Sequence, residues 1–542
     1  KLAEIFSRHI QTSREYTNIF KLVDSRVTEN RILAANMIGS LKDPKLISQL
    51  VLLLKDFRPE VKKAAFIAAT NYRTSDLSPI MLEHLASTEN YAYAYDVLLR
   101  IGEDGLEYLE KAFLNPKTDD RLLKRIVKLI GEFKSLRAQK LLLSKIDYTS
   151  PEVSFQAIGS LIEGGFEAKD ADKYRVLNAI VKIIGAVSKN MNLLYILKGQ
   201  KTDPSIIDAI RKDNQVARQN IFDLLSIVYN RNIILRLKEY IENEDLTANH
   251  FGLELLDNIL DENIKSVLVP TLQFNSPYHK VKTLQYFYVL EEIPYDEAFD
   301  QMLVAESSQT SNYTKACILN YYLSLDEVKI NDVIVSCLFH KDRLIQETAA
   351  CLIYKNDVDL YYEVVERLDV NAKYYLDNSV EFYQSRKSHL LLSKINFLYK
   401  IPYFNSLRST ILVELAKYLE INSLKESGNL TFEGEPWRYP IMFIESGRVD
   451  LVHDEHIIFT ISENNIIDFG MFHHNEDNKF TLYPKEDTVF YSISREFLNL
   501  QIFDFPELEV VFQKIMNDFY ETYKNFKKLP QKKMKKPVKL FV

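Results

Sequence analysis

The chain has 542 residues, more than one hydrophobic core usually serves, so several domains or an elongated array of repeats is expected. Hydrophobic residues make up 46% and charged residues 26%, which excludes a wholly disordered chain. The net charge of −7 gives no overall attraction to nucleic acid, so a contact with phosphate groups would need a local basic patch.

Glycine and proline are scarce, with 14 and 16 copies, whereas average proteins contain about 7% and 5% of them. We therefore expect few turns and many helices. No run of about 18 uncharged apolar residues is present, and residues 1–10 lack the apolar core of a signal peptide. The cysteines Cys317, Cys337 and Cys351 have no metal-ligand spacing, so we expect buried thiols in a reducing compartment.

Amphipathic segments of about ten to fifteen residues alternate with short polar breaks over residues 25–369, which is typical of helix–turn–helix units. Three expected helices share a proline at their first position: Pro59, Pro151 and Pro277. The first of these helices places small apolar residues on one face, at the spacing i, i+3, i+4 and i+7: Val61, Ala64, Ala65 and Ala68. Further helices are expected over residues 44–54 and 263–272.

These helix pairs resemble HEAT or armadillo repeats, whose units are about 40 residues long. The resemblance implies a HEAT-like α-solenoid over residues 1–394 with about eight to ten pairs, and an irregular α-superhelix of another repeat class is the alternative. A solenoid of this kind implies a protein partner on its surface.

Strand-like patterns follow a helix expected over residues 408–419. Residues 430–435 and 441–452 are the first expected strands, and in the second Val449 and Leu451 alternate with polar residues. The fold class is therefore mainly α, with a smaller β domain towards the C-terminus.

The order of these segments resembles the cyclic-nucleotide-binding domain family, the β-roll of the catabolite activator protein and of nucleotide-regulated kinases and channels. The matching segments are residues 401–407, 414–419, 434–435, 443–451 and 485–498. The resemblance implies a β-roll with flanking helices over residues 395–523. Gly447 is expected to take a positive φ in a hairpin.

The resemblance also implies where a ligand would lie, in the family's phosphate-binding cassette. The corresponding candidate ligand-binding residues are Phe469, Gly470, Met471, Asn478, Lys479 and Thr481. Met471 stands where the family has a ribose-binding glutamate, and Asn478 stands where it has a phosphate-pairing arginine. Lys479 supplies a point charge without the two-pronged geometry of arginine. We therefore expect that no standard cyclic nucleotide binds.

Two clusters of metal-binding residue types lie in the roll, residues 453–456 (His-Asp-Glu-His) and His473–His474 with Glu476 and Asp477. Their spacing matches no closed metal site, so no metal and no other cofactor is expected. No phosphate-binding loop, nucleophile elbow or zinc-protease motif is present either, and the sequence predicts that the chain is not an enzyme.

Residues 524–542 form a basic tail without acidic residues, expected to be disordered or peripheral. Its lysines are Lys524, Lys527, Lys528, Lys532, Lys533, Lys535, Lys536 and Lys539. The alternative is non-specific binding of nucleic acid or anionic membrane lipid by this tail. One helix, expected over residues 506–526, stands where catabolite-activator-type factors carry a helix-turn-helix domain, so no sequence-specific DNA binding is expected.

These patterns favour a non-catalytic regulatory or scaffold module of the cytoplasm. Bacterial chains in which helical repeats are followed by a cyclic-nucleotide-type roll look like the soluble tails of nucleotide-transporter-like membrane proteins. In that interpretation a membrane domain precedes Lys1 and the module lies at the cytoplasmic face of the inner membrane. The alternative is a sensor that binds a cyclic nucleotide or another small anion in the roll.

Overall fold

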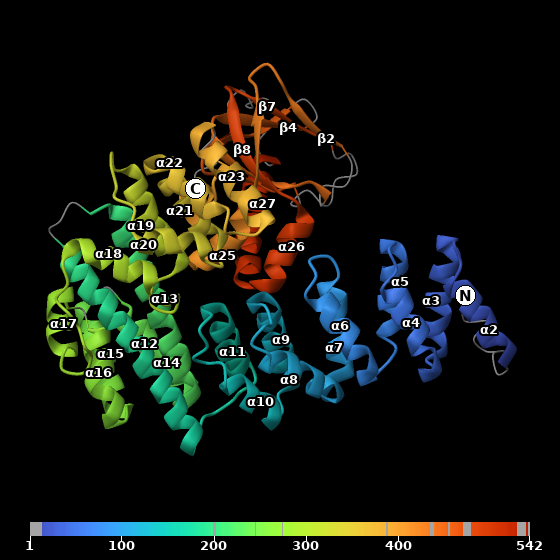
Figure 1. Cartoon of the computed structure of the whole chain (residues 1–542), viewed down its shortest axis with the longest axis horizontal. Helices are drawn as coiled ribbons and strands as arrows, with labels where there is room; N and C mark the ends of the chain where they lie inside the picture. The colour runs from blue at the N-terminus through green and yellow to red at the C-terminus, as the bar shows by residue number, and fades with distance from the viewer. Residues whose placement is uncertain are drawn as a thin grey trace. The chain divides into compact units, whose positions relative to one another are not determined.

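The structure, a computed structural model, describes residues 13–198, 202–243, 245–273, 275–385, 389–433, 438–453, 456–469, 479–527 and 538–539. It is mainly helical, with antiparallel sheets near the C-terminus, as predicted (Figure 1). The chain divides into two compact units: unit 1 is Lys1–Lys182 with Asn220–Ile259, and unit 2 is Ile183–Gln219 with Leu260–Val542.

Unit 1 contains helices that begin at intervals of 29 to 32 residues. They are α3 (Thr28–Leu41), α5 (Pro59–Ala69), α7 (Tyr91–Ile101), α9 (Asp120–Phe133) and α11 (Pro151–Glu163). Each packs against the next one (Figure 1). The other helices of this stretch are α2 (Ser13–Val23), α4 (Ile47–Leu54), α6 (Ser78–Leu85), α8 (Leu106–Leu114) and α10 (Leu136–Leu143). These intervals are shorter than the 40 residues expected for one helix pair, because the helices of this stretch and the turns between them are short.

The apolar face predicted for α5 is buried in full, with Val61 and Ala65 at 0% exposure. Small residues let this helix approach α3 closely. A Cβ atom added to Gly39 would lie 2.8 Å from the Cα of Ala68. The short distance between α3 and α5 therefore requires small residues at their contact.

Five helices share a contact that joins them to the preceding helix. In each, the side chain of the fourth residue donates a hydrogen bond to a carbonyl eight to ten residues earlier, at the C-terminal end of the helix or turn before it. The donors are Ser154, Asn249, Lys280, Lys315 and Gln346. Carbonyls at helix ends have no partner within the helix, so these side chains satisfy groups that would otherwise need water.

Two long helices, α12 (Asp170–Leu197) and α13 (Pro204–Val228), run through both units. Within the described ranges, α12 is the one helix long and apolar enough to cross a membrane by length and composition. Its Val176, Ile180 and Ile184 are buried in the protein, as in the core helix of a folded domain. Unit 1 also contains α14 (Arg231–Ile241), which packs on α15 (Leu246–Ile259).

The helical part of unit 2 precedes the sheets. Its helices are α16 (Glu262–Leu272), α17 (Pro277–Leu284), α18 (Tyr295–Val304), α19 (Asn312–Ser324), α20 (Asp332–Ser336), α21 (Arg343–Asn356), α22 (Val358–Val365), α23 (Val370–Ser385), α24 (Leu391–Leu398) and α25 (Ser409–Ala416). Helix α19 packs on both α21 and α25. Asp213 of α13, which is half-buried, accepts hydrogen bonds at the start of α19 from the backbone of Ser311 (3.0 Å) and the hydroxyl of Thr314 (2.7 Å).

The β-roll consists of two sheets with the orders β1-β8-β3-β6 and β2-β7-β4-β5-β9. Its strands are β1 (Glu420–Leu424), β2 (Leu430–Glu433), β3 (Ile441–Ser446), β4 (Arg448–His453), β5 (His456–Ser462), β6 (Ile466–Ile467), β7 (Lys479–Pro484), β8 (Thr488–Ile493) and β9 (Val538–Lys539). All pairs are antiparallel except β5 with β9. Two helices follow β8, α26 (Arg495–Asp504) and α27 (Glu507–Lys527).

Gly447 has the predicted positive φ, +91°. The hairpin expected around it is wrong, because β3 pairs with β8 and β6 whereas β4 pairs with β5 and β7. The chain therefore crosses from one sheet to the other at Gly447. A Cβ atom there would lie 2.5 Å from the Oγ1 atom of Thr488, so the crossing leaves room only for glycine.

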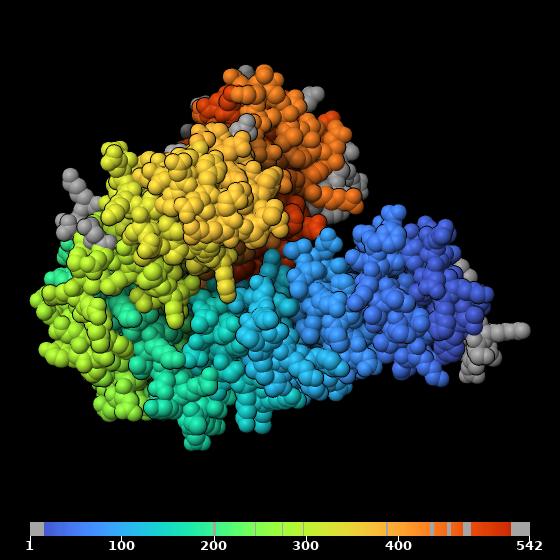
Figure 2. Space-filling model, in the orientation of Figure 1, coloured from blue at the N-terminus to red at the C-terminus, as the bar shows by residue number. Residues whose placement is uncertain are grey.

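One cluster of buried apolar residues runs through unit 2, from Leu193 on α12 through Phe299 and Leu376 to Phe443 in β3 and Phe519 on α27. On the face shown in Figure 2, the surface of α21 to α23, in yellow, continues into that of the roll, in orange. The boundary predicted between residues 394 and 395 stays a prediction, and this core lies on both sides of it.

Candidate functional site

The structure places three of the six candidate ligand-binding residues. Phe469 is fully buried, and Thr481 in β7 is buried opposite Thr431 of β2, with 3.1 Å between their hydroxyl oxygens. Lys479 begins β7 and is exposed. Its Nζ atom lies 2.6 Å from a carboxylate oxygen of Glu433, an interaction that raises the pKa of the lysine. Gly470, Met471 and Asn478 lie outside the described residues.

Three aromatic rings pack around the buried Phe469: the buried ring of Phe480 and the half-buried rings of Phe432 and Tyr439. The ring centre of Phe469 lies 4.6 Å from that of Phe432, 5.7 Å from Tyr439 and 5.8 Å from Phe480. Phe432 and Tyr439 also contact each other, at 5.0 Å. These four side chains thus form one aromatic cluster next to the point where β7 begins.

An ion pair fixes the segment that leads into the cassette. Asp468 is 1% exposed and pairs with the guanidinium group of Arg495, whose Nη1 atom lies 3.2 Å from Oδ2. The Nε atom of Arg495 also donates to the carbonyl of Tyr439 (3.1 Å). Ser494 caps α26 by accepting a hydrogen bond from the backbone of Phe497 (3.3 Å), and so places Arg495 in the first turn.

Sequence reasoning missed this ion pair. The segment around Arg495 was matched to the family's closing strand and helix, but no role was assigned to the arginine. The available signal was Asp468, a single acid between apolar residues, which needs a buried partner in a folded protein.

The two histidine clusters provide no metal site among the described residues, which contain no group of three or more His, Cys, Asp or Glu side chains suited to a metal ion. His453 and His456 are paired across β4 and β5. Asp454, Glu455 and residues 473–477 lie outside the described residues.

The basic tail is described only in part. Lys524 and Lys527 belong to the last turns of α27, and Lys539 belongs to β9. The remaining lysines lie outside the described residues: Lys528, Lys532, Lys533, Lys535 and Lys536. The expectation that the tail is disordered or peripheral stays a prediction.

The sequence and the structure of the chain can be compared with those of known proteins. No family model and no curated protein matches the sequence. The structure is similar to cAMP-bound PfPKA-R, at 11% identity and a TM-score of 0.23, over 29% of this chain and 54% of that chain. It is similar to the regulatory subunit of a cAMP-independent protein kinase A from Trypanosoma brucei, at 19% identity and a TM-score of 0.22, over 28% of this chain and 57% of that chain.

A third similar structure is the sensor domain of the transcriptional regulator DNR from Pseudomonas aeruginosa, at 16% identity and a TM-score of 0.21. The similarity covers 26% of this chain and 96% of that chain. The chain therefore spans a little more than half of the first two structures and nearly all of the third.

Proposed function

We propose that this chain is a non-catalytic regulatory or scaffold module in which the roll is a fixed part of a larger helical body. The observation that carries the proposal is the continuous core of unit 2. It includes Phe397 of α24, whose ring centre lies 5.0 Å from that of Tyr491 in β8. Helices and sheets share these buried side chains, and no flexible linker separates α24 from β8 in this core. A conformational change in the roll would therefore displace side chains of the helices directly.

In this proposal the helices of residues 1–394 form a HEAT-like array that presents its surface to a protein partner. The regular helix starts and the side-chain contacts to preceding helices support it. The attachment to a nucleotide-transporter-like membrane domain, and with it a place at the cytoplasmic face of a membrane, remains part of the proposal.

The roll in this proposal binds no standard cyclic nucleotide. Phe469 packs against three other aromatic rings of the roll, and the ammonium group of Lys479 pairs with Glu433. At Met471 and Asn478 the chain lacks the two charged side chains with which the family holds ribose and phosphate.

Calorimetric titration of the full chain with cAMP, cGMP and cyclic dinucleotides tests this. The expected result is no saturable heat at concentrations up to about 100 µM, because several charge-assisted hydrogen bonds of roughly 1.5–3 kcal/mol each are missing. Saturable micromolar binding that is lost in Gly470→Glu would contradict the proposal. It would favour the alternative, a sensor of a nucleotide or small anion.

A further inference from the structure

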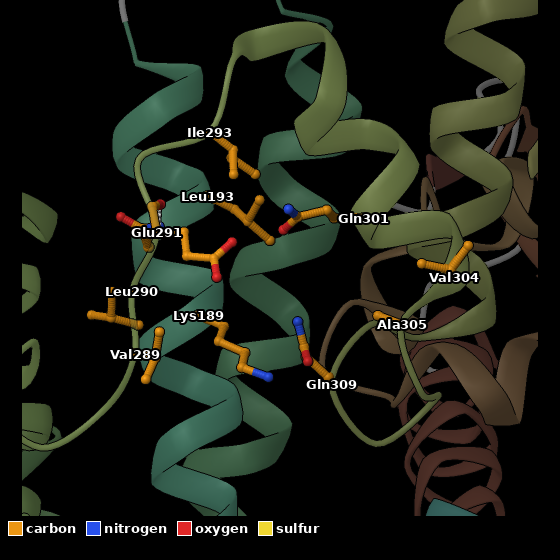
Figure 3. A pocket seen from close by; sticks show the side chains of 11 residues that line it. Lys189, Leu193, Val289, Leu290, Glu291, Ile293, Gln301, Val304, Ala305 and Gln309 are labelled. Carbon is orange, nitrogen blue, oxygen red and sulfur yellow. Dashed lines mark hydrogen bonds between the residues drawn. The ribbon is translucent and has the colours of Figure 1, made fainter.

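A pocket of about 430 Å³ lies in unit 2 between α12 and residues 289–309 (Figure 3). Its apolar wall includes Leu193, Ile293 and Val304. Its polar side chains include Lys189 and Glu291, which point towards the same space from opposite segments (Figure 3). The cyclic-nucleotide resemblance does not involve any of these residues.

Two asparagines of α12 hold the two segments that flank the pocket. The buried Asn192 donates from Nδ2 to the carbonyl of Glu291 (2.8 Å). Asn190, also buried, donates from Nδ2 to the carbonyl of Gln309 (3.1 Å) and to Oδ1 of Asn214 (3.1 Å). Both walls are thus fixed to the same helix by hydrogen bonds from buried asparagines, and the pocket is formed without a ligand.

Lys189 and Glu291 carry opposite charges at this pocket. Both are exposed, and within the described ranges no ion pair involves either of them. A ligand that carries both an ammonium and a carboxylate group would pair with both side chains at once. Gln301 and Gln309 add amide groups that can donate or accept hydrogen bonds beside them.

The pocket lining argues against other classes of ligand. Among the described residues, the lining contains neither an arginine for a phosphate group nor an aromatic ring for a nucleobase, and Glu291 is the one carboxylate there, too few for a bound metal ion. The volume lies near the lower end of the range of roughly 300–1,000 Å³ that small-molecule sites occupy.

We propose that this pocket binds a free aliphatic α-amino acid. The ammonium group of Lys189 receives the carboxylate of the ligand, and the carboxylate of Glu291 receives its ammonium group. The side chain of the ligand packs against Leu193, Ile293 and Val304. This function is independent of the roll and of the proposed scaffold role.

Calorimetry on the full chain tests the proposal with L-leucine, L-isoleucine and L-valine up to about 10 mM. Two analogues of leucine serve as comparison: isoamylamine, which lacks the carboxylate, and 4-methylpentanoate, which lacks the ammonium group. We expect saturable binding of at least one amino acid and about tenfold weaker binding of each analogue, since each lacks one charge-assisted contact.

Matched variants locate the site. Lys189→Met and Glu291→Gln are each expected to weaken amino-acid binding by about tenfold. The control variants Lys198→Met and Glu292→Gln, which change exposed residues outside the pocket lining, are expected to leave it unchanged. All four should melt at the temperature of the unaltered protein.

Three outcomes would overturn the proposal. They are the absence of saturable heat with every amino acid up to about 10 mM, equal binding of the amino acid and both analogues, and unchanged affinity in both pocket variants. None of them bears on the roll, so the proposal about cyclic nucleotides is decided separately.

Discussion

Glu347 of α21 accepts a buried hydrogen bond of 2.6 Å from the backbone N–H of Leu391, in the first turn of α24. Its carboxylate also accepts from the hydroxyl of Tyr375 (2.8 Å). The contact ties a central helix of unit 2 to the helix that leads into the roll. Burial raises the pKa of this carboxyl group to about 7, although the hydrogen bonds and Lys394 act in the opposite direction.

This raised pKa predicts a pH-dependent contribution to stability. The folded state holds the proton of Glu347 more tightly than the unfolded state, whose carboxyl group titrates near 4.5. The contribution is therefore fully present below about pH 4.5 and is lost as the pH rises to about 7, by on the order of 3 kcal/mol. Gln at this position does not titrate, so the stability difference between the unaltered protein and Glu347→Gln should shift in favour of Glu347→Gln between pH 5 and pH 8.

Urea denaturation of both proteins at the two pH values measures this shift. Glu381→Gln, which makes the same substitution at an exposed position of α23, is the control variant. An identical difference at pH 5 and pH 8 for Glu347→Gln would show that the carboxyl group titrates normally.

The close contact at Gly447 predicts that adding one methyl group there strongly lowers the stability of the roll. Gly447→Ala should destabilise the roll by more than about 2 kcal/mol, because the new Cβ would meet the Oγ1 and Cα atoms of Thr488 at 2.5 and 2.9 Å. Gly165, at the C-terminal end of α11, also has a positive φ, +67°, but no atom lies within 4 Å of its added Cβ. Gly165→Ala should therefore cost only about 1 kcal/mol. Thermal unfolding compares the two, and equal losses would mean that the contact with Thr488 is relieved.

The ion pair of Asp468 and Arg495 predicts that removal of one charge destabilises the protein more than removal of both. Arg495→Met leaves a carboxylate buried without its partner, and should destabilise the protein by about 3–5 kcal/mol. The double variant Asp468→Asn/Arg495→Met removes both charges and should recover part of that loss. Chemical denaturation gives the free energies. If the double variant is less stable than Arg495→Met alone, the buried charge is not the cause.

The cysteines predict slow thiol chemistry. All three are free and buried, as the sequence suggested. Burial raises the pKa of Cys317 to about 12 and that of Cys337 to about 11, so thiolate is scarce at pH 8. Ellman's reagent should label none of them within minutes in the native protein and all of them in guanidinium chloride. Rapid labelling of a native thiol would indicate local opening of α19 or its neighbours.

The helical character and the β-roll could be predicted because local patterns determine them. The structure confirms the buried face of small residues predicted for α5 and the positive φ predicted for Gly447. The exchange of sheets at Gly447 could not be read locally, since strand pairing depends on residues such as Thr488 that lie far along the chain. The pocket could not be predicted from the sequence either. Asn192 and Glu291 are 99 residues apart, and no local pattern connects them.

The contact from the fourth residue of a helix to the preceding helix end is made by serine, asparagine, glutamine and, twice, lysine. What recurs is the position of a donor and not its chemical identity. At these five positions the fold therefore requires a side chain that can donate a hydrogen bond, and several residue types meet that requirement. A comparison that scores residue identity gains little from such positions, whereas one that scores a side-chain donor at the fourth residue of a helix would find all five.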